Sequence, residues 1–245
     1  MNREIKIYST PHDLALGFAE DIVKMIDRSA SDKKTFTIAL SGGNTPKLLF
    51  LILADKYSES VPWNYIHFFW GDERCVPPDH SESNFGVAKI MLFDKIIIPA
   101  GNIHRIFGEN DTAAEAIRYS EEIEVFTRER DGWPVFDFVI LGLGEDGHTA
   151  SIFPGNNQLL DSEKKCEVAV HPVTQQKRLT ITGRVINNAE NIVFLVAGRS
   201  KAEVVSDIIE RPHKVSYPAA GIRPGSGMLT WYLDSEAALR LGKIN

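Results

Sequence analysis

Residues 136–155 read FDFVILGLGEDGHTASIFPG, an apolar run that passes into a polar, glycine-rich turn. The glycines at 142, 144 and 147 have the G-x-G-x-x-G spacing of a dinucleotide-binding loop. That loop requires a long helix after its third glycine, whereas Pro154 and Gly155 would end a helix here within about two turns. Glu145 and Asp146 would also lie where the negative charge of a pyrophosphate belongs. The stretch therefore indicates a buried strand that ends in a polar turn, and it argues against a dinucleotide site.

Similar apolar runs occur along the whole chain and alternate with segments of helical pattern. The strand candidates are residues 3–9, 35–40, 65–70, 136–143, 178–183, 191–198 and 228–233, and two of the helical segments are residues 45–56 and 200–211. Strands that are apolar throughout and alternate with helices are typical of a parallel sheet covered on both faces. We therefore predict an α/β fold with a mostly parallel central sheet and helices on both faces, in a single domain over residues 1–245.

Two further helices are indicated by capping signals. Thr10, followed by Pro11 and Asp13, is typical of a helix N-terminus. The apolar residues that recur at helical spacing after it are Leu14, Phe18, Ile22 and Met25. Thr112, with Glu115 three residues later, matches a capping box and predicts a charged amphipathic helix that reaches about residue 130.

The composition limits the classes of partner. The net charge of −6 argues against nucleic acid, because binding a phosphate backbone requires a basic face. No stretch approaches the roughly 18 apolar residues of a membrane span, and the N-terminal segment shows no secretory signal. We therefore expect no membrane partner and a cytoplasmic location. Cys75 and Cys166 stand outside any C-x-x-C pair, and the histidines lack ligand-like spacing, so we expect no metal site.

Four polar clusters each follow a predicted strand. They are SGGNTPK at 41–47, GDERCVP at 71–77, GEDGHTAS at 144–151 and AGRSK at 197–201. Ligands of parallel α/β folds bind beyond the carboxyl ends of the strands, so we expect these clusters to meet along one edge of the sheet. The first cluster has two glycines before a helix N-terminus, which suits a phosphate, although a plain strand-to-helix turn also needs glycine.

Each charged candidate residue in these clusters has both a functional interpretation and a simpler structural one. His148 follows Asp146 by two residues, and a neutral imidazole oriented by a carboxylate is a suitable general base near pH 7. Alternatively, Asp146 caps a short helix and His148 is a polar surface residue. Arg74 follows a buried run, from which its guanidinium could form bidentate hydrogen bonds with a phosphate or carboxylate. Alternatively, an Asp-Glu-Arg triplet is usually a solvated turn. A lysine at a helix N-terminus, such as Lys201, is unfavourable for the helix dipole, and a nearby anion would explain its presence. Alternatively, Lys201 simply faces solvent.

Taken together, the motifs resemble a known family. ALSGGNTPKLL, FFWGDERCVPPDHSESNFGVAKIMLF, FDFVILGLGEDGHTASIFPG, KRLTITGRVINNAENIVFLVAGRSKAEVV and PAAGI follow one another over nearly the whole chain. The chain resembles the 6-phosphogluconolactonases, within the glucosamine-6-phosphate isomerase/lactonase superfamily. The resemblance implies a Rossmann-like three-layer sandwich and a hydrolase of the pentose phosphate pathway. It would open 6-phospho-D-glucono-1,5-lactone to 6-phosphogluconate without metal or organic cofactor. We expect a sugar-phosphate lactone as partner and a monomer or weak homodimer.

The resemblance also implies a role for each candidate residue. His148 would be the general base that activates water, with Asp146 beside it in the site. The implied ligand contacts are Gly43, Asn44, Thr45, Arg74, Arg178 and Lys201. Among these, Arg178 and Lys201 would hold the phosphate, and Arg74 would be a substrate contact peculiar to the lactonases.

One departure separates this chain from the isomerase and deaminase branch. Those relatives carry a glutamate just before the proline that closes this segment, whereas Phe153 stands there in this chain and cannot transfer a proton. An isomerase or deaminase of amino-sugar phosphates is therefore the second hypothesis. A third is a non-catalytic sugar-phosphate sensor, which would need a partner chain because no helix-turn-helix precedes residue 40.

Overall fold

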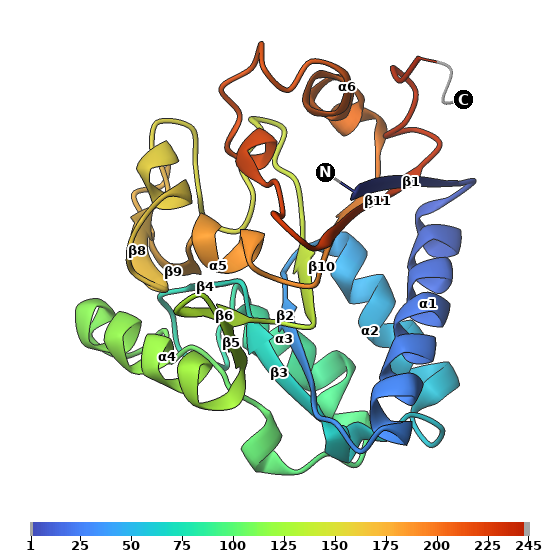
Figure 1. Cartoon of the computed structure of the whole chain (residues 1–245), viewed down its shortest axis with the longest axis vertical. Coiled ribbons are helices and arrows are strands. Elements are labelled where there is room, and N and C mark those ends of the chain that lie inside the picture. The colour runs from blue at the N-terminus through green and yellow to red at the C-terminus, as the bar shows by residue number, and fades with distance from the viewer. Residues whose placement is uncertain (1, 243–245) are drawn as a thin grey trace.

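The computed structural model describes residues 2–242, and its largest sheet has six strands that all run parallel (Figure 1). Across the sheet the order is β1 (Asn2–Tyr8), β11 (Met228–Asp234), β10 (Asn191–Val196), β7 (Phe138–Leu141), β2 (Phe36–Leu40) and β3 (Ile66–Trp70). Every residue of β2 and β7 is buried, as expected for strands covered on both faces. The predicted parallel sheet is confirmed.

The strand order reverses between β2 and β7. The chain passes from β2 to β3 on one side of this point, and from β7 to β10 on the other. The loops that follow β2 and β7 therefore leave the sheet in opposite directions, and such a switch point opens a crevice at the carboxyl ends of the strands. The two loops face each other there, because an added Cβ on Gly142 would lie 3.7 Å from Ser41 Oγ.

A smaller antiparallel sheet follows directly on β3. It consists of β4 (Asp72–Arg74), β9 (Lys177–Ile181) and β8 (Cys166–Val170). The strand predicted at residues 178–183 is thus present as β9, but it ends at Ile181 and lies in this sheet rather than the parallel one. The strand at 72–74 was not expected from the sequence, and it places Arg74 directly opposite Arg178.

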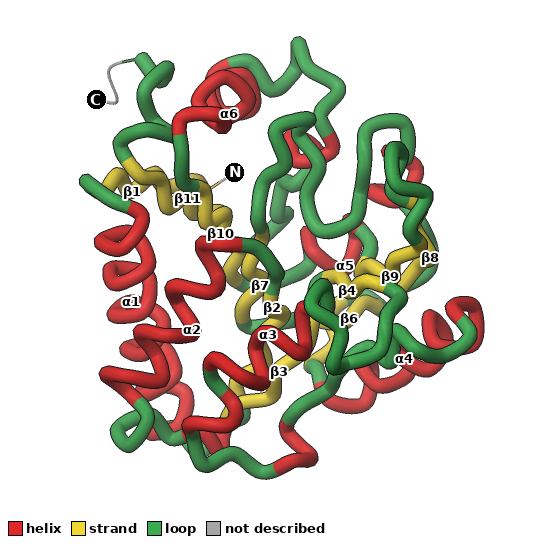
Figure 2. Tube along the Cα trace, turned by 180° about the vertical axis from the view of Figure 1, so that it is seen from behind, coloured by secondary structure: helices red, strands yellow, loops and turns green. Residues whose placement is uncertain are grey.

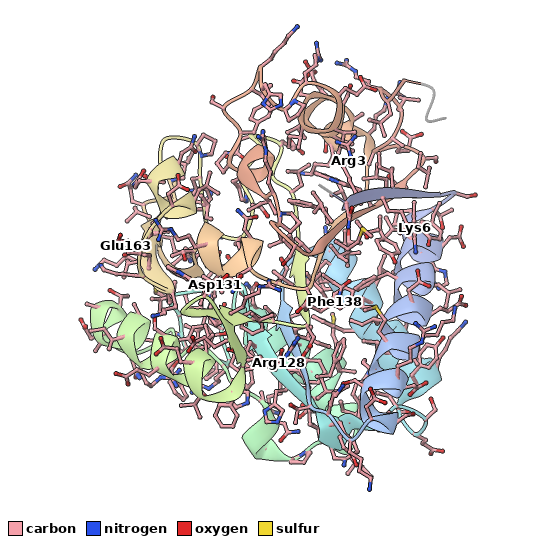
Figure 3. All side chains as sticks on the ribbon, in the orientation of Figure 1. Arg3, Lys6, Arg128, Asp131, Phe138 and Glu163 are labelled. Atoms are coloured by element: carbon pink, nitrogen blue, oxygen red, sulfur yellow. The ribbon has the colours of Figure 1, made fainter. Side chains whose placement is uncertain are left out.

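Helices cover both faces of the parallel sheet. α1 (Pro11–Ser31), α2 (Asn44–Tyr57) and α3 (Asn84–Met91) pack together on the face nearest the viewer in Figure 2. α5 (Gly183–Asn187) lies on the opposite face, in front of the sheet in Figure 1. α6 (Ala202–Glu210) lies beside β1, where Arg3, labelled in Figure 3, donates to the carbonyl oxygen of Ile209 at 2.9 Å. Among residues 2–242, no helix is both long and apolar enough to span a bilayer.

α1 begins as its sequence predicts. The Thr10 hydroxyl accepts a hydrogen bond from the backbone N–H of Asp13 at 3.1 Å. The predicted apolar face is confirmed, because Leu14, Phe18 and Ile22 are buried and Met25 packs partly buried against the same core. Each such side chain contributes roughly 1.5–3 kcal/mol by leaving water. The single-domain organisation remains a proposal, supported by one connected core that includes these residues.

The capping box predicted for α4 (Thr112–Phe126) is wrong. Asp111 is the cap, and its carboxylate accepts from the N–H groups of Ala113 and Ala114 at 3.1 and 3.0 Å. Glu115 does not return to the cap, because it is buried and accepts instead from the backbone N–H of Phe107 at 2.8 Å. An aspartate one position earlier satisfies the free N–H groups directly, so the threonine is left as the first helical residue.

The same helix also ends earlier than predicted, at residue 126 rather than about 130. β5 (Arg128–Arg130) instead pairs with β6 (Trp133–Val135) in a short hairpin. Arg128, labelled in Figure 3, donates to Asp137 Oδ1 at 2.8 Å just before β7. Tertiary pairing therefore overrides the helical pattern of the charged residues after α4.

The polar segment after β7 contains no helix. Residues 142–155 form turns, with a single bridge between Thr149 and Ile152. The N–H of Gly144 donates to the carbonyl of His148 at 2.8 Å, so the chain folds back on itself here. The short helix predicted for this segment is thus wrong, and so is the alternative in which Asp146 caps it. A dinucleotide-binding loop also requires a long helix directly after its glycines, and residues 148–155 form none.

Candidate active site

The four polar clusters meet in one pocket of about 340 Å³ at the carboxyl ends of the parallel strands. Its walls come from the loop after β2, from β4 and β9, from the turn after β7 and from the segment after β10. The predicted residues that line it are Gly43, Asn44, Thr45, Arg74, His148, Arg178 and Lys201. Asp146 does not line the pocket but contacts His148, which does. The expectation that these segments share one edge of the sheet is confirmed.

His148 and Asp146 form a close pair. His148 Nδ1 lies 2.6 Å from Asp146 Oδ1, and the backbone N–H of His148 donates to the same oxygen at 3.2 Å. Burial would raise the pKa of Asp146, but the hydrogen bonds and charge of His148 outweigh it and lower that pKa. The carboxylate therefore stays ionised and engages Nδ1, which leaves Nε2 of the imidazole for a group in the pocket.

The imidazole is also held by packing. An added Cβ on Gly144 would lie 2.1 Å from His148 Nδ1 and 2.4 Å from Asp146 Oδ1, so the pair lies directly against this glycine. The buried ring of Phe153 lies 4.9 Å from the imidazole between centroids. Only a residue without a side chain fits beneath the pair, so position 144 requires glycine.

The first turn of α2 presents free backbone N–H groups to the pocket. Gly43 precedes the helix with a φ of 109°, which an L-residue with a side chain rarely adopts. No side chain caps this helix and its first turn has no acidic residue. The N–H groups of Asn44 and Thr45 therefore remain available at the positive end of the helix dipole, where an anion is stabilised.

Three cations line the pocket as well. Arg74 and Arg178 lie opposite each other on β4 and β9, and each has a buried Nε without a hydrogen-bond partner among the described residues. Burial lowers the pKa of Arg178, against the effect of Asp72, whose Oδ2 lies 4.0 Å from Nη1. Burial likewise lowers the pKa of Lys201, whose Nζ lies 3.9 Å from Glu145 Oε1. Burial with incomplete pairing is costly, and an anionic ligand would offset that cost.

Sequence reasoning missed two buried carboxylates, Asp72 in the wall of the pocket and Glu73 next to it in β4. Asp72 and Glu73 are 5% and 2% exposed, so the alternative of a solvated Asp-Glu-Arg turn is wrong. Ser151 donates to Asp72 Oδ2 at 2.6 Å, and Asn84 also lines the pocket from the start of α3. The run of bulky residues just before Gly71 was the available signal, because a strand that leaves the core carries its next residues into buried surroundings. Among residues 2–242, no cluster of His, Cys, Asp and Glu has the arrangement of a metal site.

The fold and this pocket define a class of α/β proteins that place a His–Asp pair and several cations at a strand-order switch point. The chain belongs to the family of glucosamine-6-phosphate isomerases/6-phosphogluconolactonase, whose model matches residues 9–231. A 6-phosphogluconolactonase of Haemophilus influenzae is 47% identical over 83% of this chain and 86% of its own length.

Two solved structures are similar over nearly the entire chain. The crystal structure of a devB protein has a TM-score of 0.93 and 42% identity, covering 98% of this chain and 100% of its own. The 6-phosphogluconolactonase of Trypanosoma brucei has a TM-score of 0.88 and 31% identity, covering 98% of this chain and 99% of its own. These similarities confirm the resemblance inferred from the motifs and the α/β sandwich that it implies.

Proposed function

We propose that this chain hydrolyses 6-phospho-D-glucono-1,5-lactone to 6-phospho-D-gluconate, a step of the oxidative pentose phosphate pathway. One observation carries the proposal: a His–Asp pair and three cations share a pocket. The name of the Haemophilus influenzae relative supports it, because the match covers most of both chains.

His148 acts as the general base in this reaction. Its Nε2 takes a proton from water, and the resulting hydroxide adds to the lactone carbonyl carbon, C1. The bond between C1 and the ring oxygen then breaks, and the imidazolium returns its proton to that oxygen. The product is a carboxylic acid, which ionises. Asp146 orients the imidazole through Nδ1 and stabilises its transient positive charge, and a positioned base of this kind contributes about 10²–10⁴-fold.

The cations and the first turn of α2 bind the substrate. Arg178 and Lys201 hold the phosphate, and Arg74 contacts the substrate beside them. Gly43, Asn44 and Thr45 are the further ligand contacts, through their loop and its N–H groups. A chain with a net charge of −6 repels an anionic substrate at long range, so it requires such a local concentration of donors.

The two alternative functions have less support. An amino-sugar-phosphate isomerase or deaminase needs a proton-transferring group where Phe153 lies, and this phenyl ring is 1% exposed beside His148. Release of ammonia from glucosamine 6-phosphate would favour that function. A non-catalytic sensor has no need for a base with a carboxylate partner, so the presence of the His–Asp pair favours catalysis.

The deciding experiment is a continuous assay of the purified protein on freshly prepared 6-phosphogluconolactone. Wild type should exceed the spontaneous rate of hydrolysis, and His148→Ala should lower kcat by about 10²–10⁴-fold. Thermal unfolding of both proteins serves as the folding control. A His148→Ala rate close to that of wild type would refute the catalytic assignment.

Several finer expectations remain predictions. They are a cytoplasmic location, a monomeric or weakly dimeric state, and the absence of nucleic-acid and membrane partners. Activity after dialysis against a chelator checks the expected independence of metals and cofactors.

A further inference from the structure

The turn between β2 and α2 packs against a buried asparagine. An added Cβ on Gly42 would lie 2.0 Å from Asn84 Oδ1 and 2.6 Å from its Cγ. The φ of Gly42 is not positive, so the Asn84 side chain rather than the backbone conformation excludes a larger residue there. The Asn84 amide thus fills the space beneath the turn that leads into the first residues of α2.

Asn84 itself is fixed by β4. Its Nδ2 donates to the backbone oxygen of Asp72 at 2.9 Å and approaches Asp72 Oδ1 at 3.5 Å. Its backbone N–H donates to Glu73 Oε1 at 2.8 Å, and this oxygen also accepts from the N–H of Arg74 at 2.8 Å. Asn84 is 5% exposed. Both its side chain and its backbone are therefore held in a single arrangement.

Glu73 ties the start of α3 to the same strand. Its Oε2 accepts from the N–H of Phe85 at 2.8 Å and from Ser83 Oγ at 3.1 Å. With the two bonds to Oε1, the carboxylate has four donors around it, which offsets the cost of its burial. The result is a continuous series of contacts from β4 through Asn84 to the turn at Gly42.

We propose that Asn84 is a positioning residue that fixes the turn at residues 41–43 and so aims the first N–H groups of α2 at the anionic group of the ligand. Asn84 acts through Gly42, and Glu73 acts through Asn84. The proposal rests on the proposed function for the identity of the ligand. Its tests use inorganic phosphate as the probe, so that they do not depend on turnover.

The first test compares two buried asparagines. In Asn84→Ala the turn loses its support, and an N–H group of α2 should lose its hydrogen bond to phosphate. The binding of inorganic phosphate should therefore weaken about tenfold or more, the size expected when a hydrogen bond to a charged group is lost. KM for the lactone should rise with it, while kcat changes little, because ground state and transition state lose the same contact.

Asn102→Ala is the matched control. Asn102 is 9% exposed and donates from Nδ2 to the backbone oxygens of Asn64 and Ile66, at the amino end of β3 and away from the pocket. Its loss should lower the free energy of unfolding but change phosphate affinity less than twofold. Equal loss of affinity in both variants would overturn the proposal, because it would indicate a general effect of destabilisation.

The second test is a double-mutant cycle. Gly42→Ala should weaken phosphate binding, because the new methyl group displaces the Asn84 amide. In Gly42→Ala/Asn84→Ala the methyl group occupies space that the amide has left, so affinity should be no lower than in Asn84→Ala. Losses that multiply in the double variant would overturn the proposal. So would phosphate binding at the wild-type level in Gly42→Ala, because its methyl group should displace the Asn84 amide from beneath the turn.

The positioning role of Asn84 and the proposed function can be refuted independently of each other. If wild type binds phosphate and Asn84→Ala weakens it, but neither protein hydrolyses the lactone, the positioning role stands and the proposed function is wrong. If wild type hydrolyses the lactone and Asn84→Ala keeps both its KM and its phosphate affinity, the function stands and the positioning role is wrong.

Discussion

The imidazole of His148 is held on three sides, by a carboxylate, a glycine and a phenyl ring. Asp146 engages Nδ1 at 2.6 Å, Gly144 leaves space beneath the pair, and Phe153 packs at 4.9 Å between ring centroids. A general base works only within hydrogen-bond reach of the proton it removes, so its orientation matters as much as its pKa. These contacts explain why a glycine and a phenylalanine belong to an acid–base site.

Substitution of Gly144 tests that orientation. Gly144→Ala should lower kcat by about 10²-fold, because a displacement of about 1 Å in a catalytic group has effects of this size. Gly142→Ala is the matched control in the same loop, since its Cβ would meet Ser41 Oγ at an ordinary 3.7 Å. Steady-state assays of both variants decide the matter. Equal kcat values would show that the clash beneath the imidazole is harmless.

The phosphate role of two cations can be tested at the same scale. Arg178→Ala and Lys201→Ala should each raise KM for the phosphorylated lactone about tenfold or more, since a hydrogen bond to a charged group is removed. An unphosphorylated gluconolactone should be affected far less. Assays on the two substrates check this, and equal losses on both would remove the phosphate role from these residues.

Among the helices, α4 offers a clear test of how an element begins. Asp111→Ala should lower the free energy of unfolding by about 1 kcal/mol, because two backbone N–H groups lose their acceptor. Thr112→Ala should change it by only a few tenths of a kcal/mol, since alanine is a good helix former at the first helical position. Urea unfolding of both variants measures the difference. A larger loss for Thr112→Ala would restore the capping box predicted from the sequence.

At the scale of the whole molecule, a pair of histidines, the half-buried His67 and the buried His104, links β3 to α4. His67 Nδ1 lies 2.8 Å from His104 Nε2, and His104 Nδ1 lies 2.7 Å from Glu122 Oε1. Arg118 also pairs with Glu122. Burial, together with the charge of His104, lowers the pKa of His67. A lowered pKa means that the folded state resists protonation of this imidazole.

This pair predicts how stability depends on pH. The contribution of His67 is complete above its unfolded pKa of about 6.5 and is lost as pH falls through its lower folded pKa. The free energy of unfolding should therefore decline below about pH 6.5. His67→Gln keeps a donor for His104 without titrating, so its decline over the same range should be shallower. Urea titrations at several pH values test this, and parallel curves for the two proteins would contradict it.

The elements with continuous apolar runs were predictable, whereas those that depend on a distant partner were not. β2 and β7 are buried on both faces, so their residues alone reveal them. β4 has the sequence Asp-Glu-Arg and is a strand because β9 pairs with it. The charged residues after α4 form a hairpin strand for the same reason, through pairing with β6.

The sequence by itself determined the parallel sheet and the meeting of the four polar clusters at one edge, whereas the candidate residues from Gly43 to Lys201 came from the resemblance to a known family. Hydrophobic periodicity and turn chemistry are local, so they can be read from neighbours in the chain. Only the tertiary structure decided that Arg74 faces Arg178, that Gly144 lies beneath His148, and that Asn84 supports the turn at Gly42. Those contacts join residues that are close in space through packing and strand pairing, and the spacing of residues along the chain does not encode such distances.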